Sequence, residues 1–325
     1  MKAVFTICSP AYFAQAKTLF QSVTQFNSSY RLFLCVFNLD GHETGDYFNL
    51  PGLTIINIEE LGVAEYKKMR NQYNSFELSC ALKPFLANYI LQKYNTGLLV
   101  YFDSDILVTG ALTIAEEKLV SNEILITPHC NFLNTTGEDA LQNTNRQVIE
   151  RGCLAVGIYN GGFWAVKNTG TAINFLNWWQ KALIDGAYND PSRGLYTDQL
   201  WLNIVPVYFS ETLCVLKDPG YNMAYWNLHE RYLHITGKNY VVNNTAPLVF
   251  YHFSGYKPGA SNISVFSEVY TFENRPELKD LFSAYNSALL QNDYATWSQI
   301  KIALDDQVNK KRKYKRYLKK LKLIK

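Results

Sequence analysis

Two carboxylates at the end of an apolar segment are the residues of this chain best suited to metal chemistry. Residues 98–108 read LLVYFDSDILV, in which Asp103, Ser104 and Asp105 interrupt an apolar run. Alternate side chains of an extended chain point the same way, so Asp103 and Asp105 should share a face. Without a divalent cation or a basic partner, such carboxylates would repel each other and lose hydration. The pair therefore suits Mg²⁺ or Mn²⁺, although Asp-Ser-Asp taken alone is also typical of a turn.

A histidine late in the chain has the chemistry to complete such a site. The segment PLVFYHFSGYKPG places His252 at the end of another apolar strand, ahead of Gly255 and Lys257. Taken singly, His252 is better explained as a core histidine bonded to backbone. Together with the two aspartates it provides a nitrogen ligand, while glycine allows close approach to a phosphate and lysine supplies positive charge. The combination predicts a metal–diphosphate site.

The order of the expected elements indicates where these residues lie. Strand and helix signals alternate through the first third of the chain, which predicts an α/β domain with a parallel sheet and helices on its faces. Ligands bind at the carboxyl ends of strands in such sheets. Asp103 and Asp105 should border that crevice together with Thr6 and Cys8 at the end of the first strand. The predicted strands are 2–8, 30–40, 53–61 and 98–102, and the predicted helices are 11–26 and 76–94.

After residue 110 the pattern is less regular. The segment GIYNGGFWAVKN predicts two short strands that meet at Asn160-Gly161-Gly162. Residues 131–147, rich in Asn, Thr and Gly, predict a loop. Further helices are expected near 113–120, over 171–184, from Asp198-Gln199 onward and after Pro276, with a strand over 122–128.

Composition limits the class of protein. The chain has 325 residues, of which 48% are apolar and 18% charged, as in an ordered globular protein. Six cysteines without a CxxC pair, several of them inside apolar runs, predict buried free thiols. The first residues lack a secretory signal pattern, and no apolar run is long enough to span a membrane. These features predict a cytoplasmic protein.

Positive charge is concentrated in the last sixteen residues. Residues 310–325 contain ten Lys and Arg, so the preceding residues carry 21 basic against 28 acidic side chains. On a helix, an apolar stripe would face one way and the cations would surround it. This pattern predicts attachment to the anionic inner face of a membrane, with a solvated tail or a nucleic-acid-binding segment as the alternatives. The stripe consists of Tyr314, Tyr317, Leu318, Leu321 and Ile324.

Four short motifs follow one another within residues 1–260. They are YFDSD ending at Asp105, Tyr159 to Gly162, Asp198-Gln199, and His252 to Pro258. In this order they resemble the D-x-D, N-[SA]-G, D-Q and H-x-x-G-x-x-K-P motifs of the GT-A nucleotide-sugar glycosyltransferases, most closely glycosyltransferase family 8 and its bacterial relatives. The lysine motif is one residue shorter here, and Lys83 is the nearest candidate for the arginine that the family usually carries before its D-x-D strand.

The resemblance implies a fold and a division of the chain. The fold would be a Rossmann-like α/β domain with a mixed, mostly parallel sheet flanked by helices, followed by a C-terminal helical extension. Residues 1–260 would form the GT-A catalytic domain, with a nucleotide-binding half (1–110) and a donor-sugar and acceptor half (111–260). Residues 261–309 would be the helical extension and 310–325 the basic tail.

The resemblance also implies an activity, namely metal-dependent transfer of a sugar from a UDP-linked donor to a glycan or lipid-linked acceptor, with retention. Tyr225, Trp226 and His229 are further acceptor-site candidates, although most aromatic residues simply pack cores. The expected metal ligands are Asp103, Asp105 and His252. The donor-binding residues would be Thr6, Cys8, Tyr12, Lys83, Asp103, Ser104, Gly161, Gly162, Gly255 and Lys257, and the residues beside the transferred sugar Asn160, Asp198 and Gln199.

Other interpretations stay open at the level of sequence. Asp198 fits a helix N-cap and Asn-Gly-Gly fits a hairpin turn. A sugar-1-phosphate nucleotidyltransferase would use a similar sheet and metal, but SPAYF follows the first strand where a glycine-rich phosphate loop would be expected. A non-enzymatic, membrane-recruited binding protein is the third alternative.

Overall fold

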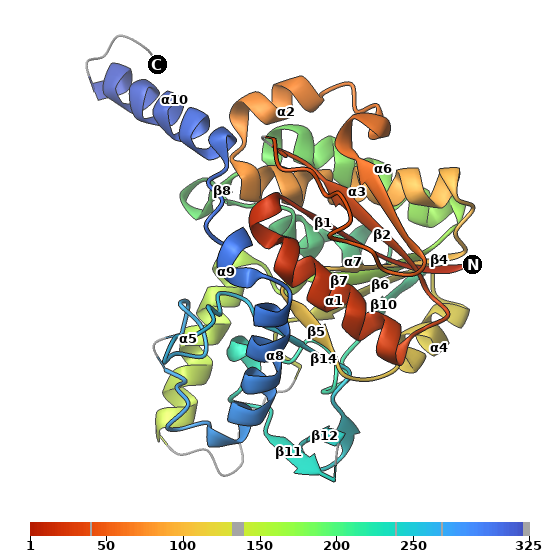
Figure 1. The fold of residues 1–325 in the computed structure, drawn as a ribbon, viewed down its shortest axis with the longest axis vertical. Coiled ribbons are helices and arrows are strands. Elements are labelled where there is room, and N and C mark those ends of the chain that lie inside the picture. Colours follow the sequence, from red (N-terminus) through yellow and green to blue (C-terminus); the bar gives the residue numbers. More distant parts are fainter. Residues whose placement is uncertain (40, 132–139, 238, 268, 321–325) are drawn as a thin grey trace.

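A seven-stranded sheet organises the molecule (Figure 1). The computed structural model describes residues 1–39, 41–131, 140–237, 239–267 and 269–320. The strand order is β10-β6-β7-β4-β1-β2-β3, and β7 runs antiparallel to both of its neighbours while the other pairs are parallel. The strands are β1 (Lys2–Cys8), β2 (Arg31–Val36), β3 (Leu53–Asn57), β4 (Leu98–Phe102), β6 (Ile124–Pro128), β7 (Tyr159–Lys167) and β10 (Leu213–Val215).

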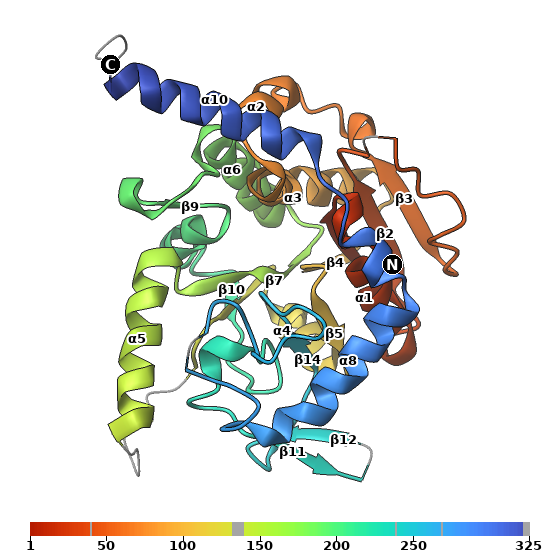
Figure 2. The ribbon, with the colours of Figure 1, turned by 60° about the vertical axis from the view of Figure 1, so that its left-hand side comes forward.

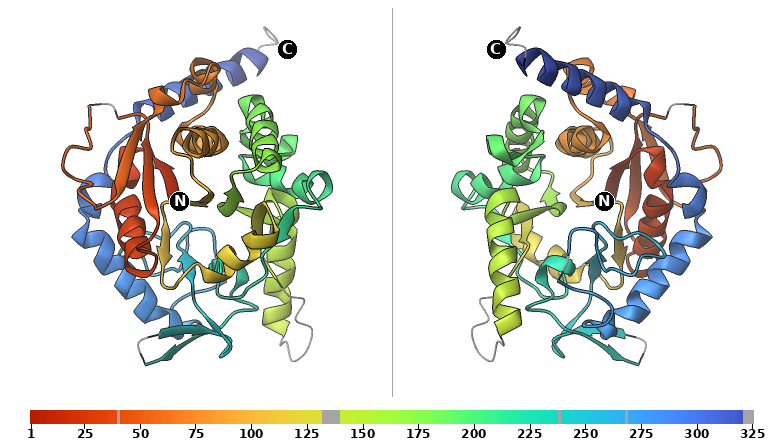
Figure 3. Two further views of the ribbon diagram at one scale, coloured as in Figure 1. Left: turned by 90° about the vertical axis from the view of Figure 1, so that its right-hand side faces the viewer. Right: turned by 90° about the vertical axis from the view of Figure 1, so that its left-hand side faces the viewer.

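Helices cover both faces of this sheet, which explains why the central strands are continuous apolar runs. Along β1, Phe5 faces a core shared with α3 (Ser75–Lys93) and α6 (Gly170–Gly186). Its neighbour Val4 faces the opposite core, shared with α1 (Phe13–Phe26) and α4 (Thr113–Ser121). Helix α3 lies between the N-terminal strands and α6 (Figure 3). The strands and helices predicted in the first third are present, but two strands are shorter than predicted. Strand β2 ends at Val36, and residues 58–61, expected at the end of β3, form a 3₁₀ helix.

A second, smaller pairing brings the late histidine to the edge of the main sheet. Strand β14 (Phe250–His252) runs antiparallel to β5 (Ile106–Val108), with His252 opposite Ile106. Because β5 starts one residue after Asp105, this register places the imidazole beside the acidic pair. Three short strands, β11 (Leu233–Thr236), β12 (Asn239–Val242) and β13 (Ala246–Pro247), form a separate sheet nearby.

The last part of the described chain contains helices, as expected, namely α8 (Lys279–Gln291), α9 (Tyr294–Trp297) and α10 (Ala303–Lys320). Helix α8 packs on Tyr251 of β14 and on Phe253, the residue that follows this strand. The start of α10 contributes Leu304 and Val308 to the core under the sheet. The helix then passes α2 (Tyr66–Gln72) and projects from the body (Figure 2).

Two predictions from the second half of the sequence are wrong. Residues 140–147, expected in a loop, belong to helix α5 (Ala140–Val156), which lies on the opposite side of the molecule from α8 in Figure 2. The remainder of that predicted loop, residues 132–139, lies outside the described residues. The polar composition indicated a loop, but Ile149, Cys153 and Val156 line a pocket beside the sheet, and tertiary context overrides a weak local preference.

The hairpin expected at Asn160-Gly161-Gly162 is also absent, because β7 passes through these residues as one strand. The backbone of Gly162 accepts a hydrogen bond from Asp103 N at 2.8 Å, so the strand continues beside the acidic turn. Both edges of β7 are paired, with β4 and with β6, which holds it extended.

The segment after Asp198 is helical as expected, although its first part, Gln199–Ile204, is a 3₁₀ helix and α7 (Val205–Tyr208) follows. The six cysteines are free thiols, of which Cys8, Cys35 and Cys80 are buried. Among the described helices, none combines the length and apolar character needed to cross a membrane.

Candidate active site

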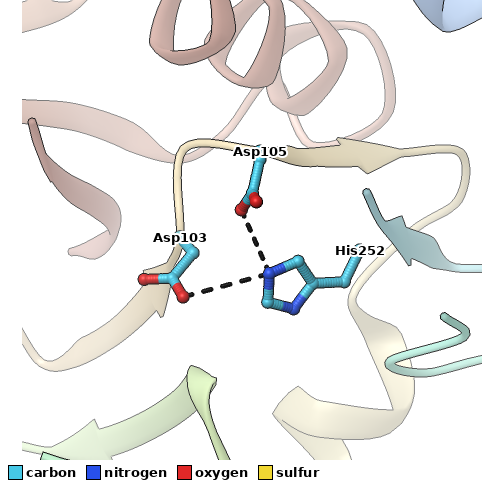
Figure 4. A group of neighbouring side chains, drawn as sticks. All are labelled: Asp103, Asp105 and His252. Atoms are coloured by element: carbon cyan, nitrogen blue, oxygen red, sulfur yellow. Dashed lines mark ion pairs between the residues drawn. The ribbon is translucent and has the colours of Figure 1, made fainter. Parts of the chain in front are cut away.

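The acidic pair and the late histidine converge at the carboxyl edge of the sheet. His252 Nε2 lies 3.0 Å from Asp105 Oδ1 and 3.9 Å from Asp103 Oδ2 (Figure 4). One donor atom from each of the three residues lies within 4.8 Å of the others. Two carboxylate oxygens and one imidazole nitrogen form a donor set that Mn²⁺ or Mg²⁺ accepts. The three predicted ligands are therefore close enough to hold one cation.

Gly162 leaves room for this cluster. A Cβ atom at this position would lie 2.5 Å from His252 Cε1 and 2.7 Å from Asp103 Oδ2. Any side chain there would displace the ligands, so the strand must carry glycine where it passes the cluster. Gly161 is similarly close to Asp198, whose Oδ2 would lie 2.9 Å from an added Cβ. The absence of a side chain at Gly161 thus lets the carboxylate of Asp198 approach the same edge of the sheet.

Lys83 joins two carboxylates of the crevice. Its Nζ lies 3.0 Å from Asp103 Oδ1 and 2.9 Å from Asp198 Oδ2, and donates to the carbonyl of Gly161 at 3.1 Å. The lysine side chain is 3% exposed. Burial opposes the ammonium, but Asp103 and Asp198 together hold the pKa of Lys83 well above its ordinary value. Lys83 is thus a structural cation of the site as well as a candidate ligand-binding residue.

The two carboxylates that share Lys83 differ in acidity. Burial works against ionisation of Asp103, but Lys83 and His252 outweigh it and lower the pKa of Asp103. Burial also dominates at Asp198, and there Lys83 offsets it incompletely, so the pKa of Asp198 is raised. Asp198 makes no N-cap hydrogen bond to the helix that follows, so the capping interpretation does not explain its side chain. Its partner is Lys83.

Asn160 and Gln199 connect the elements around the glycines. Asn160 Oδ1 accepts from Gly162 N at 2.8 Å, and Gln199 Oε1 accepts from Gly161 N at 3.0 Å. Gln199 Nε2 donates to the carbonyl of Val156 at the end of α5, at 3.0 Å. Their amide groups thus fix the path of β7, and any contact that they make with a sugar comes in addition to this positioning.

His129 belongs to the same network, although it lies in none of the sequence motifs. Its Nε2 lies 3.2 Å from Asn160 Nδ2, and its Nδ1 lies 3.0 Å from the carbonyl of Ile158. Burial lowers the pKa of His129 to about 4, so the ring is neutral near pH 7 and accepts from Asn160. The rings of His129 and His252 each contact the ring of Trp226, at 5.1 and 5.2 Å between centroids. Its one sequence signal was its place directly after the strand that ends at Pro128.

Three pockets meet at Asp105 and Phe76, and both of these residues line all three. The first, with an empty volume of about 660 Å³, is lined by Cys8, Tyr12 and Ser104 among the predicted residues. The second is lined by the predicted Lys83, Asn160, Gly161, Gly162, Asp198, Gln199 and His252. The third, here called the tyrosine pocket, is lined by Tyr12, Tyr256, Tyr285 and Tyr294 together with Gly255 and Lys257.

Thr6 is the predicted donor-binding residue that the structure sets apart. It is fully buried within β1, opposite Leu34 of β2, and does not line any of these three pockets. The acceptor candidate His229 also lines none of these three pockets. Lys257, in contrast, is exposed and lines the tyrosine pocket without touching the acidic pair. The other predicted donor-binding residues line the crevice.

Two bacterial proteins are similar to this chain in sequence. No model of a protein family matches the chain. The chain is 24% identical to the uncharacterized protein YfnF of Bacillus subtilis (strain 168) over 257 residues, which cover 78% of this chain and 82% of YfnF. It is 22% identical to the uncharacterized protein YfnD of the same organism over 291 residues, 86% of each chain.

A solved structure provides the comparison of architecture. The glycosyltransferase GlyE of Streptococcus pneumoniae TIGR4 is similar with a TM-score of 0.50 and 16% identity, over 93% of this chain and 66% of that chain. The mixed sheet with its flanking helices is the predicted GT-A glycosyltransferase fold.

Proposed function

We propose that this protein is a metal-dependent glycosyltransferase that moves a sugar from a UDP-linked donor to a glycan or lipid-linked acceptor, with retention at the anomeric carbon. The observation that carries the proposal is the convergence of Asp103, Asp105 and His252 beside the buried Lys83–Asp198 pair. Retention and the choice of UDP rest on the resemblance to family 8. The fold of GlyE is consistent with this class of activity.

Two of the three pockets would accommodate the parts of such a donor. The nucleoside would occupy the first pocket, along Cys8, Tyr12 and Ser104, and the sugar would occupy the second, beside Asp198. The diphosphate between them must then pass Asp105, which lines both pockets. A divalent cation held by the three ligands would supply positive charge to the diphosphate as its bond to the sugar breaks.

The chain's own side chains have distinct tasks in this scheme. Lys83 keeps Asp198 paired and in place, with its carboxylate toward the sugar pocket. Asn160 and Gln199 hold the two glycines, so that the strand leaves room for the donor. Lys257 is exposed at the edge of the tyrosine pocket and would pair with a phosphate once the donor is bound.

The basic helix supports a location for this activity. We propose that residues 310–325 bind the anionic inner face of a membrane, where a lipid-linked or growing polysaccharide acceptor would be met. Helix α10 carries the first part of this segment away from the body (Figure 1). Residues 321–325, which include Leu321 and Ile324 of the predicted stripe, lie outside the described part of the chain.

Binding of UDP tests the proposal directly. Calorimetry should show that Mn²⁺ strengthens UDP binding, and Asp103→Asn or Asp105→Asn should weaken Mn²⁺-dependent binding by at least about tenfold, because a cation ligand is lost. Asp185→Asn is the matched control, because that carboxylate is 66% exposed in a surface pair with Lys68. The proposed metal site would be contradicted if the UDP affinity changed neither on addition of Mn²⁺ nor on the Asp103→Asn substitution.

A further inference from the structure

The C-terminal helices form one wall of the crevice. Tyr285 and Leu289 of α8 and Tyr294 of α9 line the tyrosine pocket, as do Tyr12 and Asp105. The expected role of this extension was only to follow the catalytic body. Its contribution to a pocket that includes the candidate metal ligand Asp105 assigns it a place in the site.

The Tyr285 hydroxyl is a hydrogen-bonding group that the protein leaves unused. Its side chain is 1% exposed, and its oxygen is buried without a hydrogen-bond partner. A buried hydroxyl without a partner costs free energy, so such groups in native proteins call for an explanation such as a ligand or an ordered water. The phenol interacts electrostatically with the carboxylate of Asp105, and with the phenols of Tyr294, Tyr256 and Tyr12.

Packing fixes the Tyr285 ring relative to the metal ligands. The ring stacks on Phe253 with 3.8 Å between centroids and 17° between planes. Phe253 directly follows His252, and its backbone N donates to the carbonyl of Asp105 at 2.9 Å. The phenol is thus held rigidly against the segment that carries the cluster, as a preorganised binding group must be.

The position of the pocket indicates which part of a ligand this hydroxyl would meet. A donor with its nucleoside in the first pocket and its sugar in the second passes its diphosphate by Asp105, where the tyrosine pocket opens. Phosphate oxygens accept hydrogen bonds, and a phenol is a donor at neutral pH. Lys257 lines the same pocket and adds positive charge.

We propose that Tyr285 of α8 contacts the substrate, donating a hydrogen bond from its hydroxyl to a phosphate oxygen of the nucleoside diphosphate. The C-terminal helices then complete the donor site rather than only extending the fold. This role rests on the proposed function, because it requires a nucleoside diphosphate in the crevice.

The chain offers a matched control for this hydroxyl. Tyr251 is also 1% exposed, lies in the same core cluster and has a buried hydroxyl without a partner, but it does not line the tyrosine pocket. Tyr285→Phe and Tyr251→Phe therefore remove equivalent groups at two positions, one at the pocket and one in the core. Neither change removes a hydrogen bond within the protein, so the melting temperature of both variants without ligand should match or exceed that of the parent.

Titrations of the full chain with UDP and with uridine, both in Mn²⁺, test the role. Tyr285→Phe should weaken UDP binding roughly tenfold, as expected for loss of one hydrogen bond to a charged oxygen, and should leave uridine binding unchanged. Tyr251→Phe should change neither affinity. Equal UDP affinity in Tyr285→Phe and the parent would overturn the role, as would an equal loss for UDP and uridine, which would indicate a displaced ring.

The proposed function fails in a different way. If the parent protein does not bind UDP in the presence of Mn²⁺, the proposed donor is wrong and the role of Tyr285 falls with it. If the parent binds UDP and only the comparison of the two phenylalanine variants fails, the donor stands and the role of Tyr285 is overturned alone.

Discussion

Charged side chains are concentrated in two regions of this molecule, the crevice and helix α10. The two regions differ in how far these side chains are buried and paired. In the crevice, Lys83 lies within 3.0 Å of both Asp103 and Asp198, and the cation and one of the carboxylates are almost completely buried. On α10, basic residues follow one another from residue 310 with no acidic residue among them. Buried charges must be paired because water cannot stabilise them, whereas charges on an exposed helix need no partner.

The base of α10 stands between these extremes. Arg312 forms an ion pair with Glu77, whose side chain is 1% exposed, and also donates to the carbonyl of Gln72 at 3.0 Å. Asp305 accepts from the backbone N and the hydroxyl of Ser75 at the start of α3. The first half of α10 is thus part of the body, and a fully solvated tail does not describe it. We therefore expect the crevice charges to matter for stability and propose binding as the role of the distal ones.

Loss of the crevice cation should have the largest effect on stability. Lys83→Met leaves Asp103 and Asp198 without the cation between them, and removing one partner of a buried pair costs about 3–5 kcal/mol. Urea unfolding should show this loss. Lys68→Met is the control, because its pair with Asp185 is more than half exposed on both sides and should change stability by less than about 0.5 kcal/mol. Equal unfolding free energies for the two variants would show that the buried pair contributes no more to stability than the exposed pair does.

Loss of the cation at the base of α10 should have an intermediate effect. Arg312→Met leaves the Glu77 carboxylate buried, although it still accepts from the backbone N of Asn74 and of Asn189 at 3.0 Å each. We therefore expect a loss of about 1–3 kcal/mol in unfolding free energy. Lys313→Met, one residue further along the helix, should leave stability unchanged. The comparison is sharpened if both results hold, and a stable Arg312→Met variant would show that α10 is not anchored through Glu77.

Removal of the distal cations should have the smallest effect on the fold. A chain that ends at residue 314 keeps Asp305 and Arg312 but loses six of the ten basic residues of the tail. Its unfolding free energy should stay within about 0.5 kcal/mol of the parent. Its binding to phosphatidylglycerol vesicles should fall steeply, since each basic residue contributes about 1 kcal/mol near an anionic surface. Phosphatidylcholine vesicles are the control, and undiminished binding of the shortened chain to anionic vesicles would remove the proposed membrane role.

Local sequence patterns were sufficient to predict the strands that position the site. The apolar runs predicted β1 and β4, and the order of the elements placed Asp103 and Asp105 at the carboxyl edge of the sheet. These features follow from periodicity and from the order of strands, which a sequence contains directly. Both aspartates meet His252, but they do so from a turn between β4 and β5, which is the alternative for Asp-Ser-Asp, and not through the alternation of an extended strand.

Partners across the chain were decided only by the tertiary structure. Lys83 and Gly161 are 78 positions apart, and the bond between them exists because α3 packs on the sheet. The pairing of β6 with β7 makes His129 part of the Asn160 network, and the packing of α8 on Phe253 brings Tyr285 to the crevice. Local preference also yielded to packing where α5 replaced a predicted loop and where β7 passed straight through Asn160-Gly161-Gly162. Periodicity specifies which face of an element is buried, but which residue lies opposite that face depends on how distant elements pack, and a single sequence does not contain that pairing.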